Sequence, residues 1–210
     1  GIHHHYSNDK FAPEFSREWF AEQLKGVDTG AVSHEELLEV IFNPALYSSR
    51  LNQTAGVDMI AASAGNYYEG LTQAEVEKFY NKMIDPKDPR PISYGLNSKL
   101  VKKSGKIYEQ TYKVGGMYTE ALEKVVYWLE KAEAVAEEPL KTTIGLLIKY
   151  YKSGDLRDFD AFNISWVQDT QSNVDFVNGF TETYGDPLGF KASWEGVVTF
   201  VARAACARTQ

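Results

Sequence analysis

The sequence has 210 residues, a formal net charge of −7, and 43% hydrophobic and 24% charged side chains. This length suits one large domain or two small ones, and the composition is that of a globular chain rather than a disordered one. Its longest basic run is Lys102-Lys103, so the acidic surface is a poor match for nucleic acid or an anionic membrane. No apolar run reaches the roughly 18 residues of a membrane span.

Residues that commonly bind metals are sparse. The single Cys206 excludes an intrachain disulfide and a cysteine-based zinc cluster. His3, His4 and His5 are adjacent, and three neighbours on an extended segment cannot all face one ion. His34 has no second histidine four residues later, as a zinc-binding helix requires. We therefore expect no metal site in this sequence.

The start of the chain carries little information on location. No basic region followed by an apolar one is present, so no secretory signal is visible, which favours a cytoplasmic protein. The sequence does not begin with Met, so its first residue says nothing about targeting.

Helix-start signals dominate the first half of the chain. Ser16 precedes a short amphipathic segment, and capping boxes at Ser33 and Thr72 predict two further helices. Three prolines in residues 85–91 predict a stiff connector, which is a candidate subdomain boundary. Residues 103–106 fit either the tip of a hairpin or a loop.

Two long helices are predicted next. Apolar residues at three-to-four spacing run through residues 117–136, and a second such stretch runs from about residue 138 to a C-terminal turn at Gly154. Residues 155–163 are expected to be a polar and aromatic link into a strand-like region that spans residues 166–201.

This strand-like region contains the candidate site. Residues 174–185 alternate at period two, as a pleated strand requires, and a turn at 186–189 precedes a second strand around Trp194. The fold class is therefore α+β, predominantly α-helical with a small antiparallel β element near the C-terminus. The alternation places Glu182 and Tyr184 on the face of Phe180. A carboxylate there suits a cationic ligand and a phenol suits an oxyanion, although a purely structural role explains the pattern as well.

The same region resembles the dipeptidyl peptidase III family of zinc peptidases, in its bacterial branch. The matching residues are Gly179-Phe180, Glu182-x-Tyr184, Asp186-Pro187 and Glu195-Gly196, with weaker matches at residues 1–7, 95–101 and 112–116. The resemblance implies that Glu182 holds the free amino terminus of a peptide and that Tyr184 stabilises the transition state. It places Glu195 near the substrate cleft, and on a strand Glu195 would face away from Trp194.

The resemblance also implies what this sequence lacks. The family binds zinc through His-Glu-x-x-Gly-His and a later glutamate, and neither motif occurs here. We therefore expect residues 1–210 to be part of the non-catalytic, substrate-recognising lobe of a two-lobed enzyme that releases dipeptides from peptide N-termini. Alone it should be inactive, with zinc and the catalytic lobe supplied by the rest of the parent protein. The alternative is a non-catalytic peptide-binding or interaction module.

Overall fold

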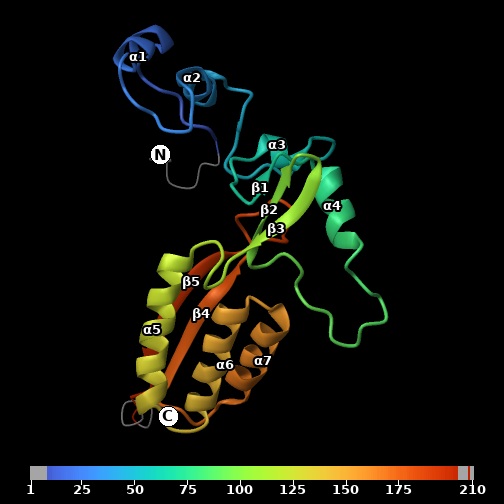
Figure 1. Ribbon diagram of the computed structural model, residues 1–210, viewed down its shortest axis with the longest axis vertical. Coiled ribbons are helices and arrows are strands. Elements are labelled where there is room, and N and C mark those ends of the chain that lie inside the picture. Colours follow the sequence, from blue (N-terminus) through green and yellow to red (C-terminus); the bar gives the residue numbers. More distant parts are fainter. Residues whose placement is uncertain (1–8, 203–207, 209–210) are drawn as a thin grey trace.

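The structure is a computed structural model that describes residues 9–202 and residue 208. The molecule is elongated, with two N-terminal helices at one end, a small sheet in the middle, and a strand ribbon covered by helices at the other end (Figure 1). The predictions for His3, His4, His5 and Cys206 fall outside the described residues.

The N-terminal part contains α1 (Arg17–Gln23), α2 (His34–Phe42) and α3 (Met59–Ala62). The hydroxyls of Ser16 and Ser33 accept hydrogen bonds from the first-turn amides of α1 and α2, at 3.1 Å in both cases. These bonds satisfy amide groups that a helix start leaves without an intrahelical partner. The two helix starts predicted from these serines are confirmed.

The middle layer combines a helix with a three-stranded sheet. It contains β1 (Tyr68–Glu69), α4 (Gln73–Asn81), β2 (Ser98–Lys103) and β3 (Lys106–Thr111), with sheet order β1-β2-β3. The Thr72 capping box is present with both of its hydrogen bonds. Residues 104 and 105 both have positive φ, as a tight hairpin turn requires, so residues 103–106 form a hairpin tip rather than a longer loop.

The C-terminal layer packs three helices on one face of a two-stranded antiparallel ribbon (Figure 1). The helices are α5 (Thr119–Val135), α6 (Leu140–Ser153) and α7 (Leu156–Gln168), and the strands are β4 (Val174–Glu182) and β5 (Ser193–Phe200). The fold class is confirmed: the chain is α+β, rich in helix, with a small antiparallel element near its C-terminus.

Helix α7 corrects the prediction for residues 155–168. The sequence pattern predicts a link and the start of the strand-like region here, but Asp155 caps a helix by accepting a hydrogen bond from the amide of Arg157 at 2.8 Å. Phe159 and Phe162 are buried one turn apart on its inner face. This spacing is helical, and burial of the two rings outweighs the weak helix propensity of aromatic residues.

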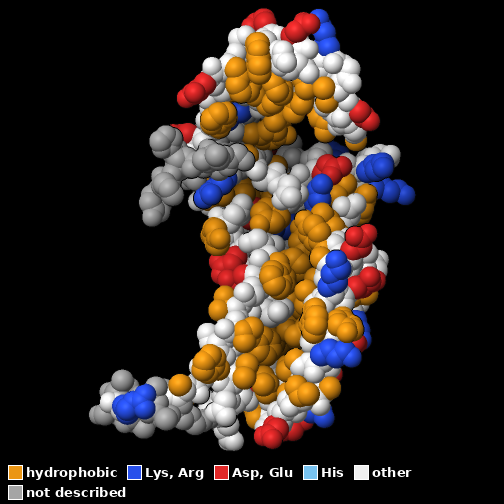
Figure 2. Space-filling view, turned by 90° about the vertical axis from the view of Figure 1, so that its left-hand side faces the viewer, with side chains coloured by type: hydrophobic (Ala, Val, Ile, Leu, Met, Phe, Trp, Pro, Cys, Tyr) orange, Lys and Arg blue, Asp and Glu red, His pale blue; other side chains and the backbone are white. Residues whose placement is uncertain are grey.

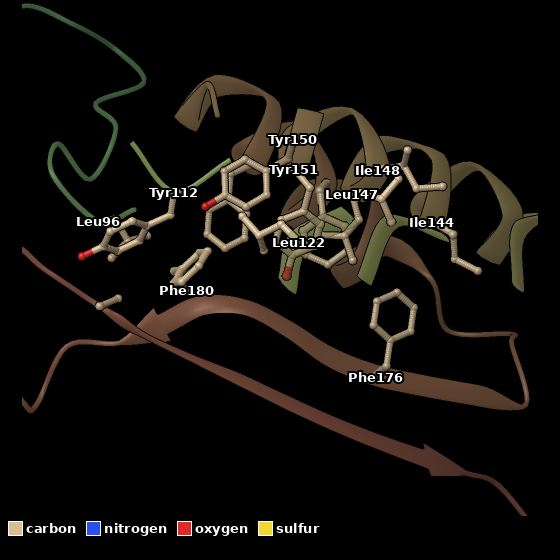
Figure 3. Close-up of a cluster of buried hydrophobic side chains, with 14 residues drawn as sticks. Leu96, Tyr112, Leu122, Ile144, Leu147, Ile148, Tyr150, Tyr151, Phe176 and Phe180 are labelled. Atoms are coloured by element: carbon tan, nitrogen blue, oxygen red, sulfur yellow. The ribbon is translucent and has the colours of Figure 1, made fainter. Parts of the chain in front are cut away.

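Two clusters of buried side chains hold these layers. The ribbon cluster lies between α5, α6, α7 and β4, and Figure 3 shows Phe176 and Phe180 of β4 projecting toward the helices. The middle cluster has Val76, Tyr80 and Leu100 at its centre. The 85–91 connector joins α4 to β2, which both contribute to the middle cluster, and a subdomain boundary there stays a prediction.

Much apolar surface remains exposed. Figure 2 shows apolar side chains along one long face of the molecule. Trp128, Val198 and Phe200 are each at least 69% exposed. None of the helices in the described part of the chain is both long and apolar enough to cross a membrane.

Candidate functional site

Two carboxylates meet at one end of the ribbon. Glu182 pairs with Ser193 in the β4–β5 ladder, and Glu195 pairs with Gly179. The side chains of Glu182 and Glu195 interact, and the repulsion between their carboxylates is the main cause that raises the pKa of Glu182 above its usual range. The hydroxyl of Thr181 donates a hydrogen bond to Glu195 Oε1 at 3.0 Å. Two adjacent carboxylates can accept charge-assisted hydrogen bonds from a cationic group.

A β-bulge brings this pair together and corrects one sequence prediction. The register shifts between Phe180, which pairs with Trp194, and Glu182, which pairs with Ser193. Because Trp194 and Ser193 point to opposite faces, Glu182 also points away from Phe180. The predicted shared face of Glu182 and Phe180 is therefore wrong, since simple alternation cannot anticipate the extra residue. Glu195 does face away from Trp194, as expected.

Tyr184 lies two residues beyond the end of β4. Its side chain is 72% exposed and forms part of the rim of an open cavity of about 420 Å³. Arg50, Asn66 and Tyr67 line the same cavity. The structure thus joins Glu182 with Glu195, and it places Tyr184 in the lining of a cavity to which neither carboxylate contributes.

A second cavity, of about 470 Å³, is lined by residues of α5, β4 and β5. Asn66 and Tyr67 line both cavities. The second cavity is walled mainly by aromatic and aliphatic side chains, including Tyr118 of the α5 start and Trp194 of β5. Burial raises the pKa of Tyr67 above its usual range, so its hydroxyl is kept as a hydrogen-bond donor. Sequence reasoning missed Tyr67 because no periodic pattern surrounds it.

The segment that links β4 to β5, residues 183–192, is held by a buried carboxylate. Asp186 is 3% exposed and accepts hydrogen bonds from the amides of Phe190 and Lys191, both at 2.8 Å. The hydroxyl of Tyr68 donates to Asp186 Oδ2 at 2.6 Å, and this ties the segment to β1. Protein donors replace water around the carboxylate, which makes its burial tolerable.

Lys191 in the same segment is fully buried. Its ammonium donates hydrogen bonds to Tyr80 Oη and, at 2.8 Å, to Ser98 Oγ. Both hydroxyls in turn donate to Glu109 Oε1, at 2.7 Å and 2.6 Å. Burial lowers the pKa of Lys191 to about 8, against the opposing effect of Glu109 and Asp186. The sequence around Lys191 is that of an ordinary turn and contains no signal for this arrangement.

The described residues do not offer a site for a catalytic zinc ion. Across residues 9–202 and 208, no three His, Cys, Asp or Glu side chains are grouped so that they could hold a metal. Glu182 and Glu195 belong to no such group among the described residues, whereas catalytic zinc is held by three protein ligands, usually with histidine among them.

The fold and the carboxylate pair define a helix-rich α+β protein with a polar site at the end of a strand ribbon. The profile of peptidase family M49 matches residues 96–210. The chain belongs to this family.

Individual relatives agree with this assignment. Dipeptidyl peptidase 3 of Mus musculus is 32% identical over 94 residues, which are 44% of this chain and 13% of the relative. Dipeptidyl peptidase 3 of Dictyostelium discoideum is 26% identical over 217 residues, covering 93% of this chain and 30% of the relative. The structure of DPP III from Caldithrix abyssi has a similar fold, with a TM-score of 0.54 and 19% identity, covering 91% of this chain and 36% of that one. The chain thus spans about a third or less of the length of the proteins it matches.

Proposed function

We propose that this chain is the substrate-recognising part of a zinc-dependent dipeptidyl peptidase. In this proposal the parent protein releases dipeptides from the N-termini of short peptides, and residues 1–210 contribute one side of the cleft but no metal ligand. Membership of peptidase family M49 supports the hydrolase class. The observation that carries the recognition role is the contact between Glu182 and Glu195, with Tyr184 two residues after Glu182 in the chain.

The carboxylate pair suits the free amino terminus of a peptide. A protonated amine between Glu182 and Glu195 would relieve the repulsion that raises the pKa of Glu182, so binding the cation and ionising the pair favour each other. A blocked, uncharged terminus would gain nothing from the pair. The carboxylate pair therefore favours peptides with a free amino terminus, which are the substrates of such an exopeptidase.

Tyr184 supplies a different interaction. Its phenol is a hydrogen-bond donor on an exposed residue that lines the 420 Å³ cavity. A donor held there can stabilise the negative charge that develops on a peptide carbonyl oxygen during hydrolysis. Zinc, when bound by the rest of the parent protein, would supply the activated water, and no residue described here takes part in that step.

Binding by the chain itself can be measured first. We expect a tetrapeptide with a free amino terminus to bind residues 1–210 in calorimetric titration, and its N-acetylated form to bind roughly tenfold more weakly. Glu182→Ala should remove that preference. The matched control is Glu137→Ala, an exposed glutamate in the turn between α5 and α6. Equal affinity for both peptides would contradict the proposed role of the carboxylates.

Catalysis is tested in the full-length, zinc-loaded protein with a dipeptidyl arylamide. Glu182→Ala should raise KM, and Tyr184→Phe should lower kcat more than it changes KM. Tyr127→Phe, an exposed tyrosine on α5, is the matched control. Peptide binding without any hydrolysis by the full-length protein would favour the non-catalytic binding module instead.

A further inference from the structure

The 183–192 segment carries Tyr184 and links the two carboxylate-bearing strands, yet most of its anchors lie outside the ribbon. Tyr184 is 72% exposed, so its own packing does not fix it. The position of its backbone therefore depends on the contacts that hold residues 183–192. Two of these contacts are hydrogen bonds between the segment's backbone and residues far away in the sequence. Gln53 Nε2 donates to Pro187 O at 3.0 Å, and the amide of Ala192 donates to Leu96 O at 3.0 Å.

A further anchor is the ammonium of Lys191. Its two hydrogen-bond acceptors come from α4 and β2, and the carboxylate of Glu109, which lies 3.7 Å from Nζ, comes from β3. The ammonium also lies 4.7 Å from the centroid of the Tyr80 ring and 5.9 Å from that of Tyr68. One side chain of the segment is thereby tied to every strand of the middle sheet and to α4.

A buried ion with this many fixed partners restricts the segment to one position. An apolar side chain of similar length could fill the same space. It would allow the segment several alternative positions, because apolar contacts have no preferred direction. The hydrogen bonds of the ammonium are directional, because the hydroxyls of Tyr80 and Ser98 are each oriented by a hydrogen bond to Glu109. Burying an ion is unfavourable for stability, so any benefit of this ammonium must come from the geometry that its hydrogen bonds impose.

We propose that Lys191 is a positioning residue, whose buried ammonium holds residues 183–192, and through them Tyr184, in place beside Glu182 and Glu195. This inference rests on the proposed function for the role of Tyr184, while the placement of the segment can be tested without it. Tyr80, Glu109, Tyr68 and Asp186 are the titratable groups that face the ammonium.

Hydrogen exchange tests the placement in the 210-residue chain. In Lys191→Met, the exchange rates of the hydrogen-bonded amides of residues 188–192 should rise at least about tenfold relative to those of α6, because the local opening of the segment becomes easier. Lys149→Met is the matched control, since it removes an exposed lysine that pairs with Asp158 on the helical side. Unchanged exchange in the segment overturns the proposal, whatever the protein's activity.

Kinetics of the full-length, zinc-loaded protein test the consequence. Lys191→Met should lower kcat about tenfold to 100-fold with KM within about threefold, because a small misplacement of a group that acts in the transition state is costly. In a Tyr184→Phe background the same substitution should lower kcat by less than about threefold, because the two residues act as one unit. An equal loss in both backgrounds would show a general structural effect and overturn the proposal.

A variant that does not fold, and a failure of the proposed function, can each be distinguished from a failure of this inference. If circular dichroism shows that Lys191→Met does not fold, Tyr80→Phe removes one acceptor of the ammonium while keeping the ring, and the same two measurements apply with smaller effects of the same sign. If the wild-type protein hydrolyses no dipeptidyl substrate, the proposed function fails, and the exchange result alone then decides whether Lys191 places the segment.

Discussion

The pH dependence of stability is the sharpest quantitative test of the Lys191 environment. Burial lowers the pKa of Lys191 from an ordinary 10.5 to about 8 in the folded chain. Between these two values the unfolded chain binds more protons than the folded one, so the free energy of unfolding rises with pH across that window. Below pH 8 Lys191 is protonated in both the folded and the unfolded chain. The full cost of burying the ammonium then lowers the free energy of unfolding.

The size of this effect follows from the shift. About 2.5 pKa units at 1.36 kcal/mol each give roughly 3 kcal/mol in total, of which about 2 kcal/mol appears between pH 7 and pH 9.5. Lys191→Met lacks the titrating group, so the unfolding free energy of the wild type minus that of the variant should rise by about 2 kcal/mol over this range. Groups that do not contact the ammonium titrate in the same way in both proteins, so their effects largely cancel in the difference.

Urea unfolding followed by tryptophan fluorescence measures this difference at each pH. Lys149→Met, whose side chain is 65% exposed, provides the control, and its difference from the wild type should stay nearly flat from pH 7 to pH 9.5. A flat profile for Lys191→Met, or one that falls as pH rises, would refute the conclusion that the buried ammonium is destabilised by desolvation.

Three other predictions concern the core, a glycine and the carboxylate pair. Leu147→Ala should lower the free energy of unfolding by about 2–5 kcal/mol, since Leu147 is fully buried in the ribbon cluster; a loss below about 1 kcal/mol in urea unfolding would contradict this packing. Gly95→Ala should destabilise the middle layer, because Gly95 has φ +90° and a Cβ there would lie 2.7 Å from Cζ of the Tyr80 ring; an unchanged melting temperature would count against that close approach. Glu195→Gln should lower the pKa of Glu182 toward its ordinary range, as followed by carboxyl NMR titration, and an unmoved titration curve would show that the two carboxylates do not interact.

Structural features that depend on local signals were predicted correctly from the sequence. Ser16, Ser33 and Thr72 marked helix starts because capping is a short-range hydrogen-bond pattern, and Gly154 ends α6 in the left-handed conformation that glycine accepts. Antiparallel strands near the C-terminus were likewise visible in the period-two alternation. The resemblance to the peptidase family named Glu182, Tyr184 and Glu195, and their functional roles remain predictions.

The sequence predicted poorly where structure depends on long-range contacts. The helical spacing of Phe159 and Phe162 was overlooked because aromatic residues also favour strands. The bulge beside Glu182 depends on how β5 pairs, which β4 alone does not reveal. Lys191 has no local signal at all, since its partners Ser98 and Tyr80 lie 93 and 111 positions away along the chain.

These separations have a consequence for synthesis on the ribosome. The middle cluster forms around residues that emerge early, but Leu188 and Phe190 also pack against it. A nascent chain that has emerged only through residue 111 therefore holds Tyr80, Ser98 and Glu109 without the ammonium that satisfies them. Contacts over such separations form slowly because a long loop must close first. The middle layer is thus expected to finish folding only after residues 183–192 have emerged and packed against it. The middle and C-terminal layers would then complete folding together rather than in the order of synthesis.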